Sequence, residues 1–194
     1  VIDYGLPKPT HRVLQEHPAI SADRLNILGH CDASVKPTIK ELRGSKVLFT
    51  DDSEEEIDLI IYATGYNMSF PFLDKEVLNP VDNQVALYRN VIHPQYPGLY
   101  FIGLVQPWGA IMPLAEAQSE WAADLIQHKC GLPSPGDMQQ ETQREHDKLA
   151  RRYTQSSRHT IQVDFFPYID QIKRDRRRKP TSAPTAAPAL AGAS

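Results

Sequence analysis

Residues 98–113 read Gly-Leu-Tyr-Phe-Ile-Gly-Leu-Val-Gln-Pro-Trp-Gly-Ala-Ile-Met-Pro, and this stretch decides how the chain folds. Its apolar run Leu99–Ile102 predicts a buried strand that ends at Gly103, before a loop. Pro113 suits the first turn of a helix, which we expect to run to about Lys129. The free N–H groups and positive dipole of such a helix N-terminus favour an electron-rich or anionic ligand. Composition alone supports an ordinary strand, loop and helix unit equally well.

A second stretch, Ile57–Tyr62, is almost continuously apolar, which is typical of a strand covered on both faces. It runs directly into Ala63-Thr64-Gly65, where glycine would let the backbone approach a ligand closely. Ligands of open α/β sheets bind beyond the carboxyl ends of parallel strands. On periodicity alone, however, a core strand that ends in a turn is the simpler interpretation. Strands over 38–42 and 46–50 precede it, so we predict a meander of three strands.

Helix signals occupy the two ends of the chain. Residues 10–29 carry the punctuation of two short helices, with Gly29 as a C-terminal cap. A further helix is predicted from Ser134, with Asp137 completing an approximate capping box, to about Tyr153. A short amphipathic segment, Val163–Ile172, closes the folded part.

The last residues differ in composition from the rest. Six of the seven residues from Lys173 to Lys179 are basic, which indicates a solvated charge block more often than a binding surface. Residues 180–194 consist mainly of Pro, Ala, Thr and Ser, so we predict a disordered tail.

The composition excludes several classes of protein. With 194 residues, 41% of them hydrophobic, and a net charge of −3, the chain is a soluble globular protein with no general attraction to nucleic acid. It has no apolar run long enough to span a bilayer and no signal sequence, which predicts a cytoplasmic protein without a membrane anchor. Cys31 and Cys130 form no CxxC, and the seven histidines show no metal-ligand spacing, so no metal site is expected. His30, Cys31 and Asp32 have the side-chain types of a nucleophile and base, but adjacent side chains rarely converge.

Two motifs carry a resemblance to a known family. The pattern Asp58-xxx-Tyr62-Ala-Thr-Gly-Tyr66 resembles the ATGY linker motif of class B flavoprotein monooxygenases. Residues 101–122, which contain Glu116-x-Gln118, are similar to the C-terminal flavin-domain segment of the flavin-containing monooxygenases. The resemblance covers about residues 5–172 and describes the C-terminal part of that family.

The resemblance implies an α/β fold: the C-terminal part of a flavoprotein with two Rossmann-like domains, one for FAD and one for NAD(P). Residues 1–63 would finish the NADPH-binding domain, 64–172 would form the second half of the FAD-binding domain, and 173–194 would be the basic run and tail. The implied cofactor contacts are Thr64, Gly65, Tyr66, Gly103, Leu104, Val105 and Gln106. The first three would lie between flavin and nicotinamide, and the last four would contact the flavin.

The implied parent enzyme is an FAD- and NADPH-dependent monooxygenase of the N,N-dimethylaniline type. Its peroxyflavin would transfer one atom of molecular oxygen to a soft nitrogen or sulfur atom of a small molecule. None of the ten glycines here forms the GxGxxG phosphate cradle, and the chain does not begin with Met. We therefore expect a C-terminal fragment that is inactive by itself, and we assign no catalytic residue within it.

Two alternatives stay open. A Baeyer-Villiger or N-hydroxylating flavin monooxygenase shares the same motifs, and an upstream FxGxxxHxxxW would favour the Baeyer-Villiger enzyme. A non-catalytic interaction module derived from the fold would be stable without flavin. The second alternative is disfavoured because strands at 57–62 and 99–102 would expose apolar surface without further covering layers.

Overall fold

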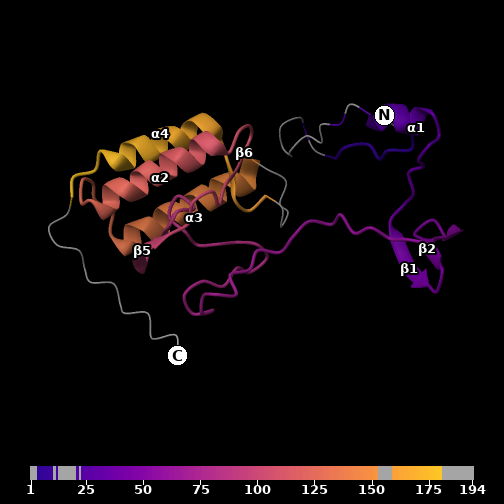
Figure 1. Cartoon of the computed structure of the whole chain (residues 1–194), viewed down its shortest axis with the longest axis horizontal. Coiled ribbons are helices and arrows are strands. Elements are labelled where there is room, and N and C mark those ends of the chain that lie inside the picture. Colours follow the sequence, from indigo (N-terminus) through magenta and orange to yellow (C-terminus); the bar gives the residue numbers. More distant parts are fainter. Residues whose placement is uncertain (1–3, 11, 13–20, 22, 153–158, 181–194) are drawn as a thin grey trace. The chain divides into compact units, whose positions relative to one another are not determined.

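The chain divides into two compact units, with the boundary between Tyr66 and Asn67. The computed structural model describes residues 4–10, 12, 21, 23–152 and 159–180, and these form four helices and seven short strands (Figure 1). The first of the two helices predicted within 10–29 falls largely outside the described residues, as does almost all of the predicted tail.

The first unit is built on a small antiparallel sheet. After helix α1 (Arg24–Gly29), strands β1 (Ile39–Arg43), β2 (Lys46–Phe49) and β3 (Glu54–Glu56) pair in the order β1-β2-β3. The last three residues of β2 are buried, whereas all five of β1 are exposed. Salt bridges such as Lys46–Glu54, with a 2.9 Å N–O distance, join neighbouring strands at the surface. The first two predicted strands are confirmed.

The third predicted strand is wrong. The pairing with β2 is made by Glu54–Glu56, and the following segment, 57–62, forms no strand. Leu59, Ile61 and Tyr62 are exposed, with 81% of Ile61 and 73% of Tyr62 accessible. Apolar content predicts burial only where neighbouring strands and covering layers exist, and the described residues of this unit supply none on that side of β3.

The second unit packs three helices around its larger core, and Leu78, Val85 and Leu87 form a second, smaller cluster. Helices α2 (Met112–Ile126), α3 (Pro135–Arg152) and α4 (Phe165–Arg176) run alongside one another in Figure 1. Their buried side chains form a single cluster together with residues from the loops and short strands. This core contains Tyr88, Val91, Ile92, Val105, Leu114, Trp121, Leu125, Cys130, Met138, Val163, Tyr168 and Ile172. The indole of Trp121 has no solvent-accessible surface, so this side chain belongs to the core and does not border a cavity.

Short strands complete the second unit. Strands β4 (Ile92–His93) and β5 (Tyr96–Tyr100) form an antiparallel hairpin, and β6 (Gln106–Pro107) pairs in parallel with β7 (Gln162–Val163). The strand expected at 99–102 therefore begins and ends earlier, because its register is set by the turn that joins His93 to Tyr96. It is half-buried and antiparallel, not a parallel strand covered on both faces.

The second helix predicted within 10–29 and the helices predicted after Pro113 and Ser134 are confirmed, with changes at their ends. His30, and not Gly29, caps α1, and the last predicted segment continues as α4 through Arg176 into the basic run. Helix α3 begins as its capping box predicts, because the Asp137 N–H donates to Ser134 Oγ at 3.2 Å. Helix α2 ends three residues before Lys129, because His128 takes a left-handed φ of 55°. The N–H groups of His128 and Lys129 then donate to the carbonyls of Leu125 and Asp124, which is a Schellman motif. The residue that ends this helix is thus a histidine, not the predicted Gly131.

The stability of the second unit should fall as the pH drops below about 7. Burial lowers the pKa of His93 from its ordinary value, and its Nδ1 accepts the Gln95 N–H at 3.2 Å, which requires the unprotonated ring. The unfolded chain therefore takes up this proton first as the pH falls through 6.5, and stability is lost until the pH passes the lower pKa of the folded state. His146, whose pKa burial also lowers, acts in the same direction. Urea unfolding between pH 8 and 5 should show a smaller loss for His93→Gln than for the unmodified chain; equal losses would contradict this assignment.

Candidate functional site

The segment that follows β5 is a turn held from inside the protein. Gly103 has a φ of 82°, and its N–H donates to Gln118 Oε1 at 2.7 Å. Val105 is buried in the core, and the Gln106 N–H donates to the Ile161 carbonyl at 2.8 Å. The four consecutive residues predicted as cofactor contacts, 103–106, therefore form one turn that these hydrogen bonds and buried contacts hold in place.

The turn offers an open approach at its glycine. A side chain at Gly103 would meet nothing within 4 Å, and the preceding Ile102 is 45% exposed. A flat aromatic ring, such as that of a flavin, could therefore approach the backbone closely at Gly103. The residues present fit such a group.

Gln118 connects this turn to the last helix. It lies on α2 with no accessible surface, and its Nε2 donates to the Tyr168 hydroxyl at 2.6 Å. The Tyr168 hydroxyl in turn donates to the Arg89 carbonyl at 2.5 Å. Burial raises the pKa of Tyr168, so the hydroxyl keeps the proton that it donates. We call the hydrogen-bonded chain Gly103–Gln118–Tyr168–Arg89 the relay.

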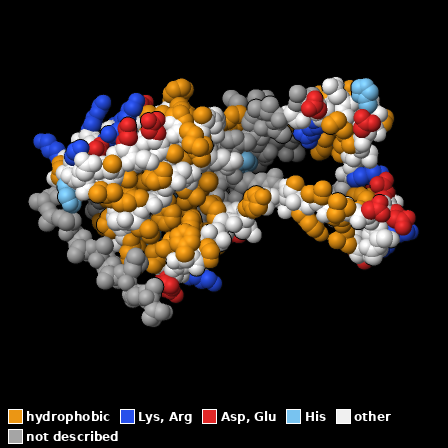
Figure 2. Space-filling view, viewed as in Figure 1, with side chains coloured by type: hydrophobic (Ala, Val, Ile, Leu, Met, Phe, Trp, Pro, Cys, Tyr) orange, Lys and Arg blue, Asp and Glu red, His pale blue; other side chains and the backbone are white. Residues whose placement is uncertain are grey.

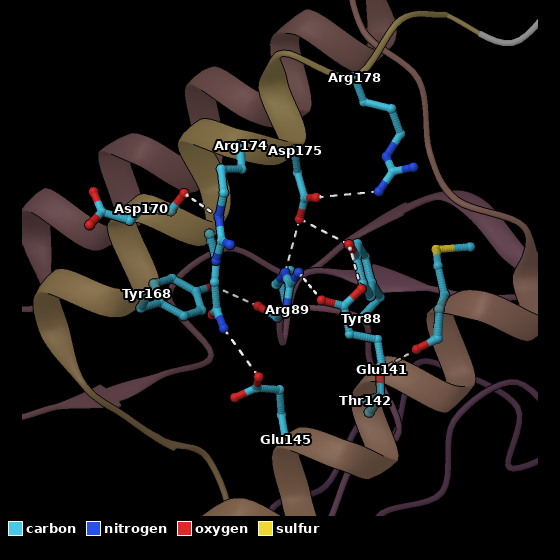
Figure 3. A network of polar contacts seen from close by, with 12 residues as sticks. Tyr88, Arg89, Glu141, Thr142, Glu145, Tyr168, Asp170, Arg174, Asp175 and Arg178 are labelled. Carbon is cyan, nitrogen blue, oxygen red and sulfur yellow. Dashed lines mark hydrogen bonds and ion pairs between the residues drawn. The ribbon is translucent and has the colours of Figure 1, made fainter.

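A buried ion cluster lies at the far end of the relay (Figure 3). The Arg89 and Asp175 side chains are each only 6% exposed, and Arg89 Nε donates to Asp175 Oδ2 at 2.9 Å. Tyr88 donates its hydroxyl to the same carboxylate oxygen at 3.0 Å, and Arg89 also pairs with Glu141. Burial raises the pKa of Tyr88, which keeps this hydroxyl protonated. The cluster fixes the backbone of Arg89, whose carbonyl the relay uses.

The other three predicted residues belong to the first unit. Thr64, Gly65 and Tyr66 follow an extended segment without strand pairing, and Tyr66 is 97% exposed. Gly65 has a φ of 91°, a backbone conformation that only glycine adopts readily. The role of the three residues stays a prediction.

Sequence reasoning missed the residues that hold the turn. Gln118 is four residues after Leu114 and three before Trp121, so it lies on the apolar stripe of α2, where a polar side chain indicates a buried hydrogen bond. That signal was available in the sequence. The parts played by Arg89 and Tyr168 were not, because they depend on contacts between residues 79 apart.

The described ranges contain no cluster of His, Cys, Asp or Glu that could hold a metal ion, and none of their helices is long and apolar enough to cross a bilayer.

Replacing Gly103 with alanine should lower the free energy of unfolding by about 1–2 kcal/mol, because a Cβ is unfavourable at positive φ. The control is Gly98→Ala in β5, where φ is not positive and the new methyl group also meets nothing within 4 Å. Denaturant titration of both variants distinguishes backbone strain from crowding. A loss of the same size in both would contradict the role of the left-handed conformation.

Comparisons with known proteins agree over most of the chain. A family profile described as Flavin-binding monooxygenase-like matches residues 2–186. Flavin-containing monooxygenase 5 of Oryctolagus cuniculus is 41% identical over 172 residues, which cover 87% of this chain and 32% of the relative. Dimethylaniline monooxygenase [N-oxide-forming] 2 of Rattus norvegicus is 34% identical over 92% of this chain and 34% of its own length. The chain thus spans about a third of the length of the curated relatives that it matches.

Two solved structures are also similar. S-allyl-L-cysteine S-oxygenase from Allium sativum aligns with a TM-score of 0.59 and 28% identity, covering 74% of this chain and 34% of that one. Tmm from Pelagibacter sp. strain HTCC7211 aligns with a TM-score of 0.56 and 20% identity, covering 70% of this chain and 31% of that one.

Proposed function

The chain belongs to the flavin-binding monooxygenase-like family, and from this premise we propose that it forms the isoalloxazine side of the FAD site in an NADPH-dependent monooxygenase. The predicted fold class, an α/β flavoprotein of the FAD/NAD(P)-binding Rossmann-like type, is confirmed by the family match and the solved neighbours. FAD is the cofactor that the family implies, and the use of NADPH is part of the proposal.

The observation that carries the proposal is the anchored turn at 103–106. Its left-handed glycine leaves the backbone open to a flat ring, and buried contacts hold it from behind. The Gln106 carboxamide can both donate and accept, which suits the edge of a flavin ring. When bound, the reduced flavin supplies the activation of molecular oxygen, and this chain's residues bind and orient the ring.

The proposed substrates are small molecules with a soft nitrogen or sulfur atom. Two similar proteins support this class, since one is an N-oxide-forming dimethylaniline monooxygenase and the other an S-allyl-L-cysteine S-oxygenase. We further propose that Thr64, Gly65 and Tyr66 lie between flavin and nicotinamide. Residues 1–63 would then complete an NADPH-binding domain, 64–172 would form half of the FAD-binding domain, and 173–194 would follow as a basic run and tail.

The 194 residues alone are expected to show no NADPH-dependent oxygenation. They contain no GxGxxG turn, which is the usual cradle for the pyrophosphate of FAD or NADPH. Hydrophobic side chains gather in a broad area over the second unit in Figure 2, and Phe72, Met112 and Phe166 are each at least 75% exposed. A surface of this kind supports packing against further protein.

A titration with three flavins tests the proposal. If this chain binds the ring and not the pyrophosphate, riboflavin, FMN and FAD should bind with similar, weak affinity, measured by quenching of flavin fluorescence. Gel filtration should then separate FAD from the protein. If none of the three flavins binds, the proposed site is wrong. If FAD alone binds tightly, these 194 residues also bind the pyrophosphate, which contradicts the expectation that its cradle is formed by other residues.

A further inference from the structure

We propose that Gln118 is a positioning residue for the flavin, acting through the Gly103 turn, with Tyr168 as its necessary partner; this inference rests on the proposed function. Neither side chain needs to touch the cofactor. Gln118 holds the turn by accepting the Gly103 N–H, and Tyr168 holds Gln118 in the orientation that makes this possible.

The chemistry of the relay requires a carboxamide. The Gly103 N–H can only donate, so the Gln118 oxygen must face it, and the amide nitrogen is then directed to Tyr168. Both distances, 2.7 and 2.6 Å, are those of well-formed hydrogen bonds. Because Gln118 has no accessible surface, its own carboxamide depends on these two protein partners and not on water.

The location of Gln118 indicates a specific structural role for its carboxamide. Its neighbours along the buried stripe of α2 are Leu114, Trp121 and Leu125, and an apolar residue at this position would need no hydrogen-bond partner of its own. The carboxamide is satisfied only because the Gly103 turn and the Tyr168 hydroxyl both reach it. Its stabilising effect is therefore directed at the conformation of the turn.

The far end of the relay is fixed by two residues of α4. Tyr168 and Asp175 are seven positions apart, so they lie on one face of the helix. Tyr168 donates to the Arg89 carbonyl, and Asp175 accepts from the Arg89 guanidinium. Helix α4 thus holds Arg89 at its backbone and at its side chain, and the orientation of the Tyr168 hydroxyl toward Gln118 follows from both contacts.

The first experiment compares riboflavin binding by the unmodified chain, Gln118→Met and Gln140→Met. Methionine keeps the volume and removes both hydrogen bonds, whereas Gln140 is exposed on α3 and serves as the matched control. We expect at least a tenfold weaker affinity for Gln118→Met, faster hydrogen exchange at the Gly103 amide, and no change in either property for Gln140→Met. Equal riboflavin affinities in all three proteins would overturn the inference while leaving the proposed function intact.

A second variant separates positioning from loss of folding. In Gln118→Glu the protonated carboxyl group has the acceptor and donor pattern of the carboxamide, whereas the carboxylate can only accept. Riboflavin affinity of this variant should therefore rise as the pH falls, and that of Gln140→Glu should not. A flat pH profile for Gln118→Glu would overturn the relay.

The failure of the proposed function gives a different pattern. If the unmodified chain binds no riboflavin while its Gly103 amide is protected from exchange, the relay exists but the flavin site is wrong, and both proposals about the cofactor fall. If Gln118→Met does not fold, Tyr168→Phe provides the same comparison, because it keeps the bond from Gly103 to Gln118 and removes only the hydroxyl that orients the amide.

Discussion

Replacing Asp175 with alanine is expected to lower the free energy of unfolding of the second unit by about 3–5 kcal/mol. The carboxylate accepts from Arg89 Nε at 2.9 Å and from the Tyr88 hydroxyl at 3.0 Å, in a site where both charged side chains are 6% exposed. Its removal leaves a buried guanidinium with one carboxylate partner fewer. Glu141 still pairs with Arg89, so the loss should lie near the lower end of that range.

Urea unfolding followed by circular dichroism measures this effect. The matched control is Asp170→Ala, which removes an exposed carboxylate from the same helix and should cost less than about 0.5 kcal/mol. The double variant Arg89→Met, Asp175→Leu should recover much of the loss, since an apolar pair avoids the desolvation of both charges. Similar losses for Asp170→Ala and Asp175→Ala would mean that the buried pair contributes no more to the free energy of unfolding than an exposed carboxylate does.

The second large effect is expected at Trp121, whose replacement with alanine should cost about 3–5 kcal/mol. The indole is wholly buried at the centre of the core and meets the Tyr88 ring edge-on, with 6.0 Å between ring centroids. Alanine at this position leaves a cavity that the surrounding core residues can only partly close. The same denaturation measurement applies.

Two further substitutions make this prediction specific. Trp121 Nε1 is buried without a hydrogen-bond partner, so Trp121→Phe removes an unsatisfied donor together with part of the ring. We expect that variant to lose clearly less than half as much as Trp121→Ala. Ile126→Ala, on the exposed side of the same helix, should be close to neutral, and a loss comparable to that of Trp121→Ala would contradict the assignment of the core.

The helices of the second unit were predictable because their signals are local. The stripe through Leu114, Trp121 and Leu125 and the capping box at Ser134 each lie within a few turns of chain, and the structure confirms both. The strands were less predictable, because a strand depends on a partner elsewhere. Residues 57–62 carry the composition of a buried strand, yet they form none.

The candidate site divides in the same way. A glycine that ends an apolar run is a local pattern, so Gly103 could be selected from the residues themselves, whereas Gln106 was selected through the resemblance of its segment to the flavin-containing monooxygenases. The hydrogen bonds that hold them come from Gln118, 15 residues after Gly103, and from residue 161. Arg89, Tyr168 and Asp175 meet through contacts that span up to 86 positions, which no local pattern indicates.

The contacts between α4 and Arg89 can form only late during synthesis of the chain. Asp175 follows Arg89 by 86 positions, so at about 5–20 residues per second the ribosome needs roughly 4–17 s to deliver the second partner after the first. While the 50 residues from Gln118 to Tyr168 are being made, the carboxamide that holds the Gly103 turn exists, but the tyrosine that orients it does not. The turn at Gly103 therefore cannot reach its final form before α4 has left the ribosome.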